Sequence, residues 1–206
     1  DNWEYFAAHP DLAEQFNRAM SNLSALAGPM IAFSYDFSPF KTLIDIGGGE
    51  GRLLAAILTT QPDLRGAVFD LPGVAEAAAE VLRGQGLEDR SEVLSGNAFE
   101  AIPGGYDAYV MRNVLHDWSD EKAVVLLANC RAAIPDHGKL LIFDAIMPAG
   151  NSPHPAKWLD LQMMVALGGR ERSAEEFRQL LDRTGFELTQ ARPLPAVIGV
   201  VEAVPR

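Results

Sequence analysis

The sequence contains a single cysteine, Cys130, among its 206 residues, which excludes an intrachain disulfide. A lone thiol is typical of proteins in reducing compartments, so we expect a cytoplasmic protein in which Cys130 packs inside a helix. Basic residues are also scarce: 17 Lys and Arg stand against 28 Asp and Glu, for a net charge of −11. This balance argues against a nucleic-acid partner, because phosphate contacts need a basic face.

Long apolar runs are missing as well, since none approaches the roughly 18 residues of a membrane span, and we expect no membrane partner. No spacing of His, Cys, Asp and Glu side chains indicates a metal site, and no serine-histidine-acid order appears. The composition, 48% hydrophobic and 22% charged, is that of an ordinary globular domain long enough to bury a core.

The most informative stretch is TLIDIGGGEG, residues 42–51. Its apolar residues predict a strand buried on both faces, and the LLAAIL that follows the glycines predicts a helix. Asp45 comes at the carboxyl end of that strand, where open α/β sheets bind ligands. Glycine allows a tight turn and a close approach of the backbone to a ligand, because it has no Cβ.

The spacing of the glycines argues against two classes of ligand site. A dinucleotide fingerprint needs a third glycine where this chain has Arg52, and no Gly-Lys-Ser/Thr follows as in a phosphate loop. The next predicted strand, GAVFD, ends in Asp70, which is placed to accept hydrogen bonds from a ribose diol. Gly47, Gly49 and Asp70 therefore predict a site for an adenosine-type cofactor, although a purely structural glycine turn remains the alternative.

Strands alternate with helices along the rest of the chain. Expected strands cover residues 43–46, 66–70, 91–96, 106–112, 139–145, 186–192 and 197–204, and expected helices cover residues 53–60, 72–83, 120–134, 157–167 and a stretch capped by Ser173 and Glu176. Near the start, Leu12, Phe16, Met20 and Leu23 follow helical spacing up to Gly28-Pro29, and a second helix is expected over 30–37. Ser119 is the expected cap of the helix at 120. The pattern predicts an α/β fold with a seven-stranded, mostly parallel sheet, a C-terminal antiparallel hairpin and helices on both faces.

A candidate proton-transfer group follows the fourth strand, in the stretch RNVLHDW of residues 112–118. His116 would lie beside the cofactor crevice, where an imidazole suits proton transfer near neutral pH. Asp144, after the fifth strand, and Glu171, in the loop GGRER, are acids that could orient it. Histidines and acids in loops are more often structural, and the residues alone leave that alternative open.

Four motifs, LIDIGGGEG, VFDLPGV, NVLHDWSD and GGRERSAEEF, occur in this order. Together they resemble the plant caffeate-type and bacterial polyketide-tailoring O-methyltransferases, class I enzymes that use S-adenosylmethionine (SAM) and release S-adenosylhomocysteine (SAH). The resemblance covers nearly the whole chain and implies a Rossmann-like SAM-methyltransferase fold. It implies a SAM-binding catalytic domain over 41–206, entered through a helical segment at 1–40. The family's N-terminal dimerisation domain is expected to be absent here, and the full-length protein to be a homodimer.

The resemblance also assigns residues. The catalytic base falls on His116, flanked by the acids Asp144 and Glu171. Cofactor contacts fall on Gly47, Gly49, Asp70, Asn97, Ala98, Arg112, Asp117, Met20 and Ser24, and acceptor contacts on Met163, Met164 and Leu167. Asn97 departs from the aspartate of many relatives, and its amide oxygen can still accept a hydrogen bond, so we expect altered but not abolished binding. The three apolar residues fit an ordinary core equally well.

The resulting hypothesis is a metal-independent O-methyltransferase for a small aromatic hydroxyl, with His116 as general base. Two alternatives stay open: a relative that binds SAM for hydroxylation or pericyclic chemistry, and a domain that binds cofactor without activity. The intact HDW argues against the first, because those chemistries need no histidine to deprotonate a phenol. Acceptor identity lies beyond the sequence.

Overall fold

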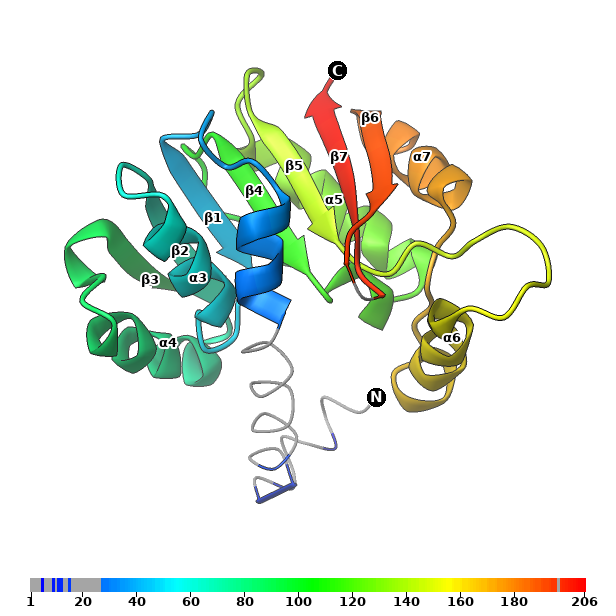
Figure 1. Ribbon diagram of the computed structural model, residues 1–206, viewed down its shortest axis with the longest axis horizontal. Coiled ribbons are helices and arrows are strands. Elements are labelled where there is room, and N and C mark those ends of the chain that lie inside the picture. Colours follow the sequence, from blue (N-terminus) through cyan, green and yellow to red (C-terminus); the bar gives the residue numbers. More distant parts are fainter. Residues whose placement is uncertain (1–4, 6–8, 10, 13–14, 16–26, 196) are drawn as a thin grey trace.

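A computed structural model describes residues 5, 9, 11–12, 15, 27–195 and 197–206 of the chain. Its central feature is one sheet of seven strands in the order β3-β2-β1-β4-β5-β7-β6 (Figure 1). The strands are β1 (Thr42–Ile46), β2 (Arg65–Asp70), β3 (Ser91–Ser95), β4 (Ala108–Arg112), β5 (Lys139–Phe143), β6 (Phe186–Pro193) and β7 (Gly199–Pro205). Strands β1 to β5 pair in parallel, whereas β7 runs antiparallel to both β5 and β6. The predicted sheet and its C-terminal hairpin are confirmed.

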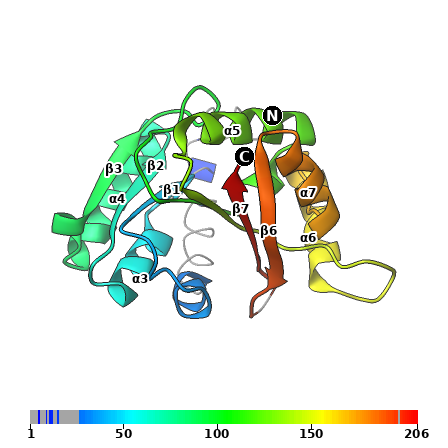
Figure 2. The ribbon, with the colours of Figure 1, turned by 90° about the horizontal axis from the view of Figure 1, so that it is seen from above.

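Helices cover both faces of this sheet, as the alternation of strands and helices predicts (Figure 2). The helices are α3 (Arg52–Thr60), α4 (Pro72–Gly84), α5 (Asp120–Ala133), α6 (Pro155–Ala166) and α7 (Ala174–Asp182), with a further helical segment over residues 27–34. The segment at 27–34, α3 and α4 share one apolar cluster with the sheet, and α5 and α7 share the other. Strand β1 supplies both clusters, with Leu43 on one face and Ile44 and Ile46 on the other. This burial on both faces explains its continuous apolar sequence.

One local prediction is wrong, and a second is confirmed only in position. Gly28 and Pro29 do not end a helix but lie inside the helical segment 27–34, which also stops short of the predicted residue 37. A Cβ at Gly28 would come within 3.3 Å of the Arg52 carbonyl oxygen, so this glycine serves close packing against α3 rather than helix termination. Ser119 occupies the N-cap position of α5, yet its side chain makes no capping hydrogen bond. The capping box of Ser173 and Glu176 on α7 is confirmed.

The strand order reverses between β1 and β4, which lie side by side although the chain leaves them toward opposite edges of the sheet. At such a switch point the loops after the two strands diverge and leave a crevice at the carboxyl ends. The loop after β1 is the glycine turn, and the loop after β4 carries His116, in the short 3₁₀ turn η2 (Leu115–Asp117). Among the described residues, no helix has the length and apolar content needed to cross a membrane.

Candidate active site

The glycine turn after β1 has a backbone that depends on glycine. Gly47, Gly49 and Gly51 have φ angles of 68°, 56° and 71°, a region that residues with a Cβ adopt rarely. The Asp70 carboxylate fixes the turn, because its Oδ2 accepts a hydrogen bond from Gly49 N at 2.8 Å and its Oδ1 accepts one from Leu71 N at 2.7 Å. A Cβ placed on Gly49 would meet no atom within 4 Å among the described residues. The turn therefore presents backbone without side chains beside a carboxylate. This fits a cofactor that lies close to the backbone and whose ribose hydroxyls donate hydrogen bonds to the carboxylate.

Buried charges lie behind this turn. Asp45 is 1% exposed, and burial raises its pKa to about 7, although the charge of Arg112 opposes the shift. Burial lowers the pKa of Arg112, while Asp45 and Asp144 favour its charged form. Arg112 thus links the carboxylate of β1 to the one that follows β5. Within the described residues, Asp45 Oδ2 and Asp144 Oδ2 are buried without a hydrogen-bond partner.

His116 lies on the other side of the crevice and is 6% exposed. Its Nδ1 donates a hydrogen bond to Glu171 Oε1 at 2.8 Å, and its Nε2 lies 3.3 Å from Asp117 Oδ1. The predicted pairing of His116 with Glu171 is therefore present in the structure. Asp144, the second predicted acid, acts on the imidazole through its charge, while its Oδ1 accepts a hydrogen bond from Asn113 N at 2.8 Å.

The carboxylates around His116 make it a strong base. Burial alone would lower the pKa of the imidazole, but the hydrogen bond to Glu171 and the charges of Asp144 and Asp117 raise it to about 9. Burial in turn raises the pKa of Asp117 to about 7, against the opposing charge of His116. At neutral pH the unliganded imidazole is thus protonated. Asp117 Oδ1 is 3.3 Å from Nε2, so a group that took its place beside Nε2 would remove one of the charges that raise the pKa of the ring.

The loop of residues 168–172 docks directly onto the turn that carries His116. Arg170 N donates a hydrogen bond to His116 O at 2.9 Å, and Glu171 N donates one to Asp160 Oδ1 of α6 at 2.9 Å. A Cβ on Gly169 would overlap the carbonyl oxygen of His116 and come within 2.6 Å of the carbonyl carbon of Asp117. This contact requires a residue without a side chain.

We expect Gly169→Ala to destabilise the protein, because the new methyl group meets backbone rather than a flexible side chain. Overpacking of this kind typically costs about 1–3 kcal/mol in the free energy of unfolding, measured by urea denaturation. The control is Gly73→Ala in α4, where an added Cβ meets nothing within 4 Å among the described residues. Equal stability of the two variants would contradict the close contact at Gly169.

The structure describes most of the other predicted site residues. Asn97 and Ala98 follow β3, next to Asp70, whose carbonyl oxygen accepts a hydrogen bond from Gly96 N at 2.9 Å. Asn97 Oδ1 accepts a hydrogen bond from Phe99 N at 3.0 Å. In α6, Met163 is buried, whereas Met164 is 59% exposed, and Leu167 beyond it is half-buried. Met20 and Ser24 lie outside the described residues.

Among those described, no group of three or more His, Cys, Asp or Glu side chains is arranged to hold a metal ion.

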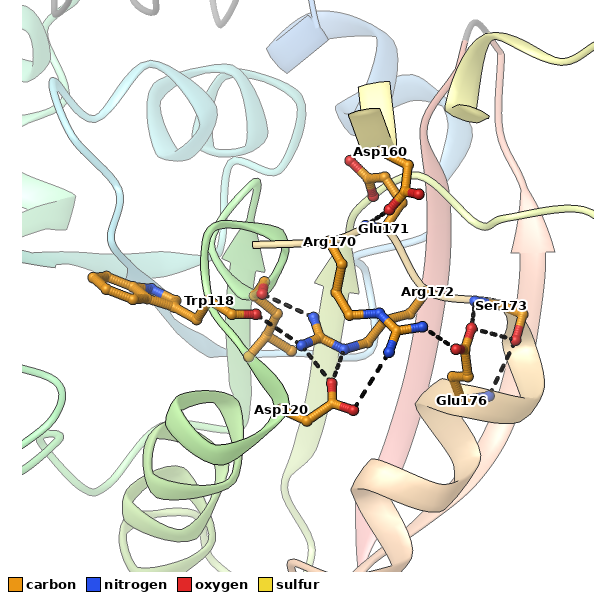
Figure 3. Close-up of polar contacts among 9 residues, drawn as sticks. Trp118, Asp120, Asp160, Arg170, Glu171, Arg172, Ser173 and Glu176 are labelled. Atoms are coloured by element: carbon orange, nitrogen blue, oxygen red, sulfur yellow. Dashed lines mark hydrogen bonds and ion pairs between the residues drawn. The ribbon is translucent and has the colours of Figure 1, made fainter. Parts of the chain in front are cut away.

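Arg172 is a site residue that the sequence motifs did not indicate. Its side chain is 1% exposed, and its guanidinium lies between Asp120 and the carbonyl oxygens of Leu115 and Trp118, as Figure 3 shows for Asp120 and Trp118. The loop GGRER was predicted to matter for Glu171 alone. The bonds of Arg172 to backbone carbonyl oxygens become visible only once the packing is known.

Comparison with known proteins agrees with this geometry. A family model described as an O-methyltransferase domain matches residues 1–187. The chain is 44% identical over 201 residues to the phenazine O-methyltransferase PhzM of Lysobacter antibioticus, which takes in 98% of this chain and 59% of that protein. The crystal structure of LaPhzM matches with a TM-score of 0.95 and 44% identity, over 99% of this chain and 61% of that one.

A second solved structure carries ligands. NcsB1, an O-methyltransferase from neocarzinostatin biosynthesis in complex with SAM and 2-hydroxy-5-methyl naphthoic acid, matches with a TM-score of 0.88 and 36% identity. That match covers 99% of this chain and 61% of the NcsB1 chain. The chain thus spans about three fifths of the length of the proteins it matches. The predicted methyltransferase fold is confirmed.

Proposed function

The chain belongs to the family of O-methyltransferase domains, and from this premise we propose that the whole protein transfers a methyl group from SAM to a hydroxyl of a small aromatic acceptor. The observation that carries the proposal is the position of His116, paired with Glu171 at 2.8 Å beside the crevice of the glycine turn. We assign 41–206 to the SAM-binding catalytic domain, entered through 1–40, in a cytoplasmic homodimer.

SAM, when bound, supplies an electrophilic methyl group on a positively charged sulfur. The residues proposed to hold it are Gly47, Gly49, Asp70, Asn97, Ala98, Arg112 and Asp117, together with Met20 and Ser24. The bare backbone at Gly49 and the Asp70 carboxylate beside it support this assignment. Met163, Met164 and Leu167 are the proposed acceptor contacts.

His116 is proposed to take the proton of the acceptor hydroxyl. A phenol has a pKa near 10 and is a poor nucleophile at neutral pH, so removal of its proton makes the oxygen reactive. Glu171 holds Nδ1 and so directs Nε2 toward the proton to be removed, while Asp144 stabilises the imidazolium that forms. The rest of the rate enhancement comes from positioning of the two reactants.

The cofactor assignment is tested by calorimetry with SAM, SAH and, as a control, NAD. Binding of SAM and SAH in the micromolar range without binding of NAD is expected. Failure of the whole protein to bind SAM would overturn the proposal. Product analysis with phenolic acceptors then separates methyl transfer from hydroxylation, pericyclic chemistry and binding without turnover.

We expect Asp70→Ala to weaken SAM binding by about 10- to 100-fold, because a hydrogen bond to a charged group contributes about 1.5–3 kcal/mol. Asp63→Ala, at an exposed aspartate in the turn before β2, is the matched control, since it also removes one carboxylate. Equal SAM affinity in both variants would show that Asp70 serves only the turn.

A further inference from the structure

The turn that carries His116 has little support of its own. It is a short 3₁₀ segment with long internal hydrogen bonds, 3.3 Å from Asp117 N to Val114 O and 3.2 Å from Trp118 N to Leu115 O. Hydrogen bonds at this end of the distance range are weak. Such a turn needs partners from outside if it is to hold a side chain in one position.

Those partners come from residues 170–172, more than 50 positions further along the chain. Arg172 Nη1 donates a hydrogen bond to Leu115 O at 2.8 Å, and its Nη2 donates one to Trp118 O at 2.9 Å (Figure 3). Arg170 N donates to His116 O between them, at 2.9 Å. Carbonyl groups on both sides of the histidine, and that of the histidine itself, are thus bound by one short loop.

Arg172 is itself held firmly. Its Nε and Nη2 both contact Asp120 Oδ1, at 2.9 and 2.8 Å, in the first turn of α5. Its carbonyl oxygen accepts a hydrogen bond from Met147 N at 2.9 Å, which ties it to the segment after β5. The next residue, Ser173, is the N-cap of α7. The backbone of Arg172 and the direction of its guanidinium are therefore both fixed by hydrogen bonds.

We propose that Arg172 is a positioning residue for His116: its buried guanidinium fixes the turn of residues 115–118 so that the imidazole Nδ1 stays within hydrogen-bond distance of Glu171. The inference rests on the proposed function, in which His116 is the base. A guanidinium suits this task because it is planar, keeps its charge and offers several donors in fixed directions. Lysine offers one compact ammonium and cannot bind both carbonyls and Asp120 in the same geometry.

The chain contains a matched arginine that does similar work elsewhere. Arg90 Nη1 donates to Gln61 O at 3.0 Å and to Leu64 O at 2.9 Å, and its Nη2 donates to Leu58 O at 3.0 Å. These groups lie where α3 ends and β2 begins, at the amino ends of the strands and away from the crevice. Arg90→Lys therefore removes the same kind of support without touching the His116 turn.

The experiment compares Arg172→Lys with Arg90→Lys in the whole protein. Both variants are expected to unfold at lower urea concentration. Only Arg172→Lys should lower kcat, by about 10- to 100-fold as expected for a misplaced catalytic group, with the dissociation constant for SAM changed less than about threefold. The NMR signal of the Nδ1 proton that His116 shares with Glu171 should broaden or vanish in Arg172→Lys and persist in Arg90→Lys.

A second variant and the proton signal keep the proposal testable if Arg172→Lys does not fold or if the wild type does not bind SAM. If Arg172→Lys does not fold, Asp120→Asn leaves the arginine in place and loosens its anchor, and a smaller loss of kcat and of the proton signal is expected. An unchanged kcat and proton signal in the folded variant would overturn the proposal and leave Arg172 a purely structural residue. The proton signal is measured without any methyl transfer. A wild-type protein that binds no SAM would therefore refute the proposed function while the role of Arg172 is still decided.

Discussion

Replacement of His116 by glutamine is expected to lower kcat by about 10²- to 10⁴-fold, the usual contribution of a general base, while SAM affinity changes little. Glutamine keeps a hydrogen-bond donor toward Glu171 and a similar volume, so the buried turn should retain its shape. It cannot take a proton from a hydroxyl at neutral pH. Steady-state kinetics with a phenolic acceptor and calorimetry with SAM measure the two quantities separately.

The pH profile gives a second measure of the same group. In the unliganded protein the base form of His116 appears only as the pH rises through its pKa of about 9, because Glu171, Asp144 and Asp117 hold the proton on the ring. The value of kcat/KM for SAM reports groups of the free enzyme, so it should rise toward pH 9 in the wild type. His116→Gln should lose this rise and keep only the dependence that comes from ionisation of the acceptor.

His137→Gln is the matched control, since His137 is exposed and pairs only loosely with Asp107, at 3.4 Å. It should leave kcat and the pH profile unchanged. If His116→Gln weakens SAM binding as strongly as it lowers kcat, His116 belongs to the architecture of the cofactor site. Retention of full activity in His116→Gln would remove the general-base mechanism.

The sequence predicted the strand, turn and helix of the proposed cofactor side well because these elements are local. The strand, the glycine turn and the helix α3 follow one another within residues 42–60, and each has its own periodicity or backbone requirement. Asp70 follows from the same logic, since adjacent parallel strands end at one edge of the sheet. Even so, the bond from Gly49 N to Asp70 appears only in the structure.

On the proposed catalytic side, the sequence named His116 and Glu171 but not how they are held. His116 and Glu171 are 55 residues apart, so the residues alone made Glu171 only one of two candidate acids, and the motif resemblance kept both. The contact of Asp117 with Nε2 and the bonds of Arg172 to two backbone carbonyls could not be predicted, because a carbonyl group carries no sequence signature. The prediction that Gly28-Pro29 ends a helix was wrong for a related reason, because Gly28 is explained by its close packing against α3 and not by helix termination.

Replacement of Glu171 by glutamine is expected to lower kcat by about 10²- to 10⁴-fold, although it removes only a charge. In the serine-protease triad, an amide in place of the orienting acid costs about 10⁴ in kcat, because the imidazole takes the wrong tautomer. Kinetics at pH 7 and pH 9 measure the effect here. Glu175→Gln, at an exposed acid on α7, is the control for loss of one carboxylate.

The structure indicates which way the new amide would turn. Glu171 Oε2 is buried and lacks a hydrogen-bond partner among the described residues, whereas Oε1 contacts His116 Nδ1. An amide NH₂ at the Oε2 position would leave buried donors unpaired, which is rarer in proteins than an unpaired acceptor. The amide nitrogen is therefore expected to face Nδ1, which moves the ring proton to Nε2, next to Asp117. A histidine in that tautomer cannot accept a proton from the acceptor.

A competing expectation has the opposite sign. If Glu171 served only to raise the pKa of His116, its removal would increase the fraction of neutral imidazole at pH 7 and would raise kcat/KM there. A loss of kcat that persists at pH 9 supports the orienting role. A gain at pH 7 would contradict that role.

The same variant should change how stability depends on pH. The folded-state pKa of His116, about 9, lies above its ordinary value of 6.5, so its charged form stabilises the fold fully below pH 6.5, and this contribution is lost as the pH rises through 9. Burial opposes the shift, and the hydrogen bond with Glu171 is the largest contribution in its favour. Urea denaturation should therefore show Glu171→Gln more strongly destabilised relative to wild type at pH 6 than at pH 10. A deficit of the same size at both pH values would mean that Glu171 stabilises the fold by packing alone, and that the charge of the imidazolium is held by Asp144 and Asp117.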